Sequence, residues 1–463
     1  MRGRLLVNVL LAALLSACSL RAPYEPPQVD PARFTQGDPS TFADEPFDPA
    51  WWEQFQDEVL AGLVSRALEA NHDIRIAAAR VEQARAIFDD VARDRFPTAT
   101  LGASVDRRSH MVPGFTDERV ETTTYAAGFD AFWEIDLFGR VRSATRAAAV
   151  TAQGFELTLE DVRVRVAAEV ARTYFELRGL QHQLAVAERS LLNQRETLRL
   201  TRVRREAGTG EEQDVASAAA RVAAIEASVP PLRAALVQRE HRLAVLTAVR
   251  PGELRADLAP RAYPALRTAL AIGEPADLLR RRPDVRAAER RLAAAAAREG
   301  VAAAELYPRV TVSGFLGLLA GRGNLFGRAE SAAWAVTPAL SWAAFDLGSA
   351  RARLRGAEAA TREALAEFDA AILLALEETE NALVAYREEQ QRLVRLAEQA
   401  GESTRAADIA RVRYREGIID FLALLDAERT QLQAEDAVAQ AEVGVFTGVV
   451  AVYKALGGLP GVP

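Results

Sequence analysis

The chain has 463 residues, enough for about three average domains, with 49% apolar, 26% charged and only 7% aromatic side chains. That apolar fraction excludes a disordered chain, and the recurrence of Ala, Leu, Arg and Glu predicts long helices. The formal charge is −7, and it becomes −9 without Arg2 and Arg4, which lie in a segment that we expect to be removed. No basic domain is present to neutralise phosphates, so nucleic acid is not an expected partner.

Sequence motifs for catalysis or metal binding are absent. The single lysine, Lys454, lacks the preceding glycine of a Walker A loop, which excludes that class of ATPase. The four histidines lie far apart in the sequence, and no His-Glu-x-x-His or paired-cysteine spacing occurs. We therefore expect no enzyme activity, no catalytic residues, no metal site and no cofactor.

Residues 1–17 have the pattern of a bacterial lipoprotein signal peptide. A charged start precedes an apolar stretch that is shorter than the roughly 20 residues of a membrane-spanning helix. The following Ser16-Ala17-Cys18 resembles a lipobox, so Cys18 is the predicted lipidation site and mature N-terminus. The alternative is an ordinary buried thiol behind a chance apolar run. Ser19 resembles an outer-membrane sorting address, and the proline-rich residues 18–50 are predicted to form a lipid-anchored tether.

Two halves of the chain resemble each other. Asn71-His72-Asp73-Ile74-Arg75 aligns with Arg282-Pro283-Asp284-Val285-Arg286, and Phe96-Pro97 aligns with Tyr307-Pro308, at the same offset of 211 residues. Later matches need only two single-residue deletions. Each half is expected to run helix, two short strands, very long helix, turn and long helix.

The element bounds follow from proline, glycine and apolar periodicity. A short helix over 51–70, with Trp51 and Trp52 as packing residues, precedes the first repeat. No proline occurs between Gly139 and Gly208, and leucines recur there every seven residues, which indicates a coiled coil. Pro230-Pro231 is expected to kink or break a return helix. The predicted segments are the first repeat 71–249 (strands 97–107 and 122–136, helices 140–207 and 211–248), a connector 250–281, the second repeat 282–457 (strands 308–319 and 331–345, helices 349–416 and 420–456) and a tail 458–463.

The four predicted strands alternate apolar with small or polar residues. The clearest case has Trp334, Val336, Pro338, Leu340 and Trp342 on one face. Such strands, with aromatics near both ends, are typical of an outer-membrane β-barrel, and the alternative is an amphipathic soluble sheet. Four strands cannot close a barrel, so copies of the chain must share one. Two copies would supply eight strands and a filled interior, whereas three would supply twelve and leave a lumen.

The most specific stretches of the sequence are Trp51-Trp52 with Phe55, Asn71–Arg75 with Ala79–Arg85, Trp133–Arg140, Arg281–Arg286 with Glu289, and Tyr414–Gly417 with Leu425-Asp426-Ala427. They resemble the outer-membrane factor family, the TolC-like exit ducts, and within it the NodT/OprM-type lipoproteins of efflux pumps. The resemblance covers essentially the whole mature chain. It implies a mainly helical homotrimer with a 12-stranded barrel in the outer membrane and a 12-helix α-barrel across the periplasm. It also implies a periplasmic adaptor (membrane fusion) protein and an inner-membrane RND-type transporter as partners, besides outer-membrane lipid.

The family's periplasmic entrance corresponds here to four residues of the second coiled coil, Tyr414, Leu422, Asp426 and Arg429. Threefold symmetry would make each a ring, and three Asp426 carboxylates would form a collar that favours cations. Tyr414 and Arg429 would link neighbouring helices. The alternative is that Asp426 is a solvated helix residue with Arg429 as its i,i+3 partner.

The coiled coils reverse at two glycines, which the resemblance makes candidates for adaptor docking. The docking residues are expected to be Gly208, Thr209, Gly417 and Ile418. As a compatible alternative, the glycines are simply helix C-caps with left-handed backbone.

The expected function is a passive trimeric exit duct of a tripartite RND-type efflux system, lipid-anchored in the bacterial outer membrane and extending into the periplasm. Such a duct conducts small molecules such as drugs. The alternatives are an exit duct for type I secretion and a non-conducting periplasmic coiled-coil lipoprotein.

Overall fold

The structure, a computed structural model, describes residues 24–27, 34–38, 41–43, 45, 50–111, 118–254, 258–264, 269–273, 278 and 280–458. Cys18, the predicted signal peptide and most of the predicted tether lie outside the described residues. The chain divides into two compact units. Unit 1 comprises Met1–Gln28, Arg80–Glu156 and Ala287–Ala370, and unit 2 comprises Val29–Ala79, Leu157–Arg286 and Ala371–Pro463.

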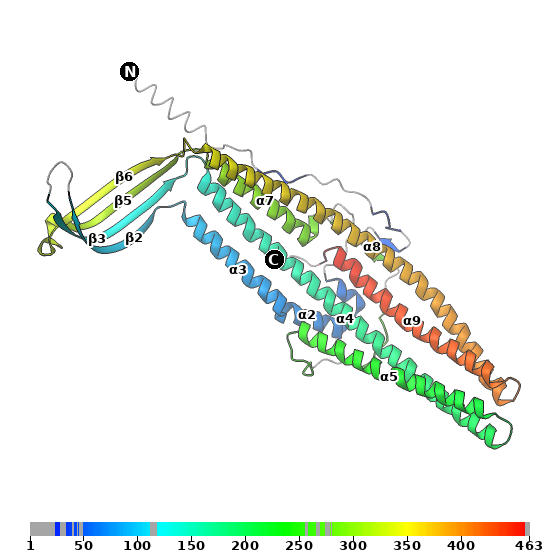
Figure 1. Ribbon diagram of the computed structural model, residues 1–463. Coiled ribbons are helices and arrows are strands. Elements are labelled where there is room, and N and C mark those ends of the chain that lie inside the picture. The colour runs from blue at the N-terminus through cyan, green and yellow to red at the C-terminus, as the bar shows by residue number, and fades with distance from the viewer. Residues whose placement is uncertain are drawn as a thin grey trace. The chain divides into compact units, whose positions relative to one another are not determined.

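The described chain is mainly helical, and two helices of nearly 70 residues contribute to both units (Figure 1). These are α4 (Arg140–Glu206) and α8 (Leu347–Arg415), where the sequence predicts helices over 140–207 and 349–416. At 1.5 Å per residue each extends about 100 Å. The other helices are η1 (Trp51–Phe55), α2 (Glu58–Ala70), α3 (His72–Arg93), α5 (Glu212–Leu246), α7 (Pro283–Ala304), η2 (Gly323–Leu325), η3 (Ala329–Ser331) and α9 (Phe421–Ala455).

Unit 1 contains a four-stranded antiparallel sheet in the order β2-β3-β5-β6. Large apolar residues form one row across it, because Leu101 pairs with Phe129, Phe129 with Leu316, and Leu316 with Trp334. All four side chains are more than half exposed. The predicted apolar faces of the four strands therefore lie on one face of the sheet. The strands are β2 (Thr98–His110), β3 (Val120–Ile135), β5 (Arg309–Ala320) and β6 (Ala332–Ser341), and a separate two-stranded pair joins β1 (Phe42–Ala43) to β4 (Leu270–Ala271).

The opposite face carries a row of small residues, in which Gly128 pairs with both Gly102 and Gly317. A Cβ on Gly128 would lie 2.6 Å from the Leu316 carbonyl oxygen, and one on Gly317 would lie 2.3 Å from the Ala127 carbonyl oxygen. Any larger residue would force these two strands apart. The pair thus requires glycine on both sides.

The outer strands β2 and β6 each pair with a single strand among the described residues. Both therefore carry one edge whose backbone groups find no partner in the described part of the chain. β6 also ends at Ser341, four residues before the predicted end at 345. The chain turns there, since the Asp346 amide donates to the Ala343 carbonyl at 2.8 Å.

Two tryptophans tie the sheet to the helices that precede it. The Trp133 indole nitrogen donates to the Arg95 carbonyl at 3.1 Å, and that of Trp342 donates to the Leu306 carbonyl at 3.0 Å. Both carbonyls lie just beyond a helix C-terminus and two residues before a proline, where the helical hydrogen bonds end.

The core of unit 2 is aromatic. Trp51 is 2% exposed and stacks on Tyr453 with ring centroids 5.6 Å apart, while Phe55 meets Phe175 edge-on at 4.8 Å. Trp51 and Trp52 are buried, which confirms them as packing residues. Helix α9 is long and apolar enough in composition to span a membrane, but Val449 and Val452 are buried in this core.

Helix α5 runs without interruption through Pro230 and Pro231, so of the predicted kink or break the structure excludes the break. The prolines remove the donors for the carbonyls of Glu226 and Ala227. Both of these residues are exposed, and water can bind the freed oxygens.

Candidate functional site

The candidate site is the far end of the two coiled coils in unit 2, where α4 turns into α5 and α8 into α9 (Figure 1). Gly208 and Gly417 have positive φ angles of 74° and 73°. The Thr209 amide donates to the Arg204 carbonyl and the Ile418 amide to the Arg413 carbonyl, at 2.9 and 2.8 Å. Each long helix thus ends in a Schellman motif, which confirms the glycines as C-caps.

The four candidate docking residues are all exposed in the single chain. Ile418 is 62% exposed, although it is a large apolar residue. The Thr209 hydroxyl is turned back onto the Arg204 carbonyl at 3.1 Å, which fixes the first turn. After the second turn, Asp420 caps α9 by accepting from the Ala423 amide at 2.8 Å. Two rigid turns therefore present short exposed loops.

Three of the four candidate gate residues share one exposed stripe of α9. Leu422, Asp426 and Arg429 follow one another by four and three residues, the spacing of one helix face. Leu422 is 60% exposed, and the Asp426 and Arg429 side chains are 66% and 56% exposed. Arg429 Nη2 lies 2.5 Å from Asp426 Oδ1, so the i,i+3 pair is present within one chain. Such an exposed pair contributes only tenths of a kcal/mol to stability.

Tyr414 lies elsewhere, because its side chain is buried within the chain's own tip. Its ring meets Phe421 edge-on at 6.0 Å, and the Arg204 guanidinium lies 4.6 Å from the ring centroid. Arg204 Nη1 also donates to the Tyr414 carbonyl at 2.8 Å. Tyr414 therefore joins α8 to α4 within one chain and does not face outward with Asp426.

Sequence reasoning missed Glu428, which is 4% exposed beside the candidate gate residues. Its carboxylate accepts from Arg411 Nε at 2.9 Å, Gln194 Nε2 at 2.5 Å and the Thr197 hydroxyl at 3.3 Å. These donors come from α8 and α4. The sequence does contain a signal that Glu428 is buried, because Phe421, Leu424 and Glu428 have helical spacing and the first two are apolar.

A second arginine, Arg221 on α5, approaches the same cluster. Burial lowers the pKa of its guanidinium, and the positive charge of Arg429 lowers it further, while Glu428 acts in the opposite sense. Its Nε atom has no hydrogen-bond partner among the described residues. All four long helices thus contribute charged or polar groups to this end of unit 2.

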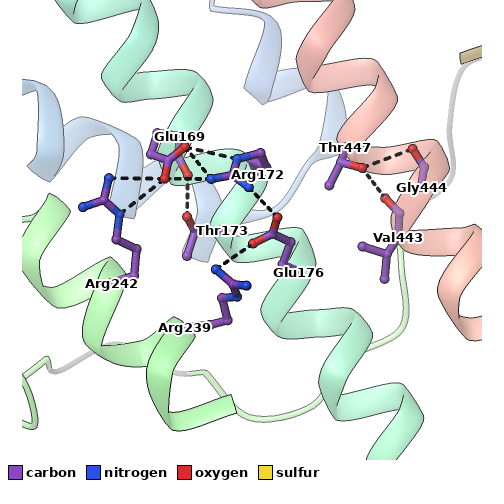
Figure 2. A network of polar contacts seen from close by, with 9 residues as sticks. All are labelled: Glu169, Arg172, Thr173, Glu176, Arg239, Arg242, Val443, Gly444 and Thr447. Atoms are coloured by element: carbon purple, nitrogen blue, oxygen red, sulfur yellow. Dashed lines mark hydrogen bonds and ion pairs between the residues drawn. The ribbon is translucent and has the colours of Figure 1, made fainter. Parts of the chain in front are cut away.

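Ion pairs join α4 and α5 further along the first coiled coil (Figure 2). Arg242 lies 3.3 Å from Glu169, Arg239 lies 3.3 Å from Glu176, and Arg172 bridges both carboxylates at 2.8 and 2.6 Å. Nearer the tip, the pairs Arg233–Glu188 and Arg195–Glu226 continue this pattern. The first coiled coil is therefore held by charges along its length as well as by apolar packing.

Within the described residues, no cluster of three or more His, Cys, Asp or Glu side chains has an arrangement that could hold a metal ion. The carboxylates of the site instead bind arginines and amides of the chain. This arrangement can hold helices together or present charge to a solute.

The comparisons with known proteins agree with this architecture. The family model described as outer membrane efflux protein matches residues 63–249 and 275–458. The solved structure of the outer-membrane channel OprN is 49% identical, with a TM-score of 0.93 over 95% of this chain and 99% of that chain. The pyoverdine export outer membrane protein OpmQ of Pseudomonas putida is 32% identical over 89% of this chain and 88% of its own length. The outer membrane protein OprJ of Pseudomonas aeruginosa is 30% identical over 98% of this chain and 95% of its own length. The family model covers most of both halves, and the chain belongs to the outer membrane efflux protein family.

Proposed function

We propose that this protein is the passive exit duct of a tripartite RND-type efflux system and that three copies form one 12-stranded barrel. The observation that carries the proposal is the open four-stranded sheet with its exposed apolar row. Backbone groups at a sheet edge are not tolerated in hydrocarbon, so β6 of one copy would pair with β2 of the next. Three copies would leave a lumen, whereas two would give a filled barrel.

The duct would be built from an internal repeat. The same order of two strands and two long helices occurs twice, as β2-β3-α4-α5 and β5-β6-α8-α9. Each repeat would supply two barrel strands and one coiled coil, and six repeats would surround the lumen. The internal resemblance at a fixed offset in the sequence supports this division.

Lipid would anchor the mature N-terminus at Cys18 in the outer membrane. The lipobox supports this assignment, and several acyl chains on one residue give stable anchoring. The two helical turns would dock on the periplasmic adaptor through Gly208, Thr209, Gly417 and Ile418. Their exposure in the single chain supports that role. OpmQ and OprJ, as outer-membrane proteins of this family, support a place in an export system.

The entrance would be closed by the exposed stripe Leu422, Asp426 and Arg429, repeated three times. Opposite charges on one stripe let Arg429 exchange its own Asp426 for that of a neighbouring copy. Tyr414 would support the gate indirectly, because its contact with Arg204 holds α8 against α4. Opening would then be a population shift biased by adaptor contact, with no chemical step.

Single-channel conductance in a planar bilayer tests this gate. Asp426→Ala and Arg429→Ala should each raise the conductance of the trimer, because either change removes a charged contact at the constriction. Glu398→Ala is the matched control, since Glu398 forms a similarly exposed i,i+3 pair with Arg395 on α8. Conductance that stays at the parent value in both gate variants would remove the gate assignment.

A further inference from the structure

Unit 1 contains a groove of about 570 Å³ that the duct function does not use. Its floor is a stripe of α4 in which Ala144, Ala147, Ala148 and Thr151 recur at helical spacing. Side chains of α3 and α7 form the walls on either side. A Thr151 contact to α7 and an Arg85–Glu156 ion pair to α3 hold these helices against α4. The volume lies in the usual range for a small-molecule site, about 300–1,000 Å³.

The groove is lined by apolar side chains that the chain itself leaves uncovered. Ile87 on α3 is 54% exposed, and Phe155 at one end of the floor is 37% exposed. Val91 and Val301 complete the walls above the small alanines. A ligand that removes such apolar surface from water gains about 25 cal/mol of binding free energy per Å². The floor from Ala144 to Phe155 spans about 16 Å at 1.5 Å per residue, which suits one extended chain.

The charges around the groove are mainly positive. Arg353 is paired with Glu305 at 2.6 Å, so these two cancel. Arg298 donates to the Thr151 hydroxyl at 3.2 Å and Arg80 lines the opposite wall. Neither Arg80 nor Arg298 forms an ion pair within the described part of the chain. Two uncompensated guanidinium groups therefore border an apolar floor, although the whole chain has a net charge of −7.

We propose that this groove binds a free, small anionic amphiphile with a single apolar chain. The chain would lie on the alanine stripe of α4, and its carboxylate, sulfonate or phosphate would pair with Arg80 and Arg298. The floor length of about 16 Å favours one chain over a two-chain membrane phospholipid. The site is independent of the gate, because its lining residues belong to unit 1 and the gate residues to unit 2.

The test uses the full-length protein in phosphatidylcholine nanodiscs, without detergent, and a tryptophan reporter introduced as Phe155→Trp. Quenching is titrated with 11-bromoundecanoate and with an 11-bromoundecyl trimethylammonium of the same chain length. Empty nanodiscs and the parent protein give the background from partition into lipid and from native tryptophans. We expect saturable quenching by the carboxylate, with roughly tenfold weaker binding of the cation.

Three further variants, each in the reporter background, separate the two halves of the proposal. Ala148→Phe fills the floor and should weaken both probes at least tenfold. Arg80→Gln with Arg298→Gln should remove the preference for the anion while leaving the cation's affinity unchanged. Arg291→Gln is the matched control, because Arg291 is exposed on α7 but does not line the groove.

The outcomes decide the proposal in either direction. Quenching that never saturates, or that Ala148→Phe leaves unchanged, overturns the site. Saturable binding with equal affinity for both probes overturns its anionic character, and displacement by phospholipid but not by undecanoate assigns the groove to membrane lipid instead. Should Ala148→Phe fail to assemble, the arginine variant still decides, because its substitutions change exposed charge and leave the apolar side chains of the groove unchanged.

Discussion

The buried Glu428 gives a prediction that concerns the connection between the two coiled coils. Glu428→Gln keeps the shape of the side chain but replaces one carboxylate oxygen by an NH₂ group. At least one of the donors Arg411, Gln194 and Thr197 then loses its acceptor in a buried position. A buried unsatisfied donor costs about 1–3 kcal/mol, and the charge of the pair with Arg411 is lost as well. Because Arg411 is 26% exposed, water reduces that second cost, and we expect about 3 kcal/mol in total.

Hydrogen–deuterium exchange measures this loss of stability in the helices around Glu428. If opening of the tip is the exchanging motion, about 3 kcal/mol corresponds to roughly 100-fold faster exchange in the segments of α4 and α9 that meet at Glu428. Glu402→Gln is the control, since Glu402 is 79% exposed and forms only a long i,i+3 pair with Arg405 at 3.8 Å. It should change exchange by less than about twofold. Equal exchange rates in Glu428→Gln and the parent would refute the role of Glu428 as a structural hub.

Three other predictions follow from single contacts. Gly417→Ala should destabilise the tip by about 1–2 kcal/mol, because alanine is strained at φ 73°. Gly401→Ala should instead stabilise α8, because Gly401 lies in an exposed part of that helix with open space around it. Hydrogen exchange at the two sites measures both effects. Trp133→Phe and Trp342→Phe should each cost about 0.5–1.5 kcal/mol by thermal unfolding, whereas Trp334→Phe, at a side chain 77% exposed, should cost less. The hydrogen bond to Glu442 raises the pKa of His182, so the charged pair stabilises fully below about pH 6.5 and loses this contribution as pH rises through the raised pKa. Melting of His182→Gln should therefore differ most from the parent at pH 5.5 and least at pH 9, and a difference that is constant with pH would contradict the link.

The elements that sequence alone predicts are those with a strong period. The alternation around Trp334 and Leu316 is a period of two, and the structure places both residues in one row of the sheet. The long helices follow from proline-free stretches between glycines, and Gly208 and Gly417 are the positive-φ residues at their ends. These features depend on residues that are neighbours in the sequence, so the sequence alone predicts them.

The contacts that sequence reasoning missed depend on which helices meet. Glutamate is usually a surface residue, and Glu428 can be buried only because partners on α4 and α8 donate hydrogen bonds to its carboxylate. Family resemblance groups Tyr414 with Asp426, but the ring lies on the buried side of α8 against Arg204. Pro230 and Pro231 leave α5 whole because the carbonyls that they deprive of donors face water. Each outcome is set by tertiary surroundings that a linear pattern does not contain.

One chain supplies too few strands to enclose a lumen, so several copies must share one barrel. Native mass spectrometry of the full protein extracted in mild detergent counts the chains in that barrel. We expect a complex of three chains whose mass does not change on dilution, together with aggregation when detergent is removed. A stable single chain in detergent-free buffer would overturn the shared barrel.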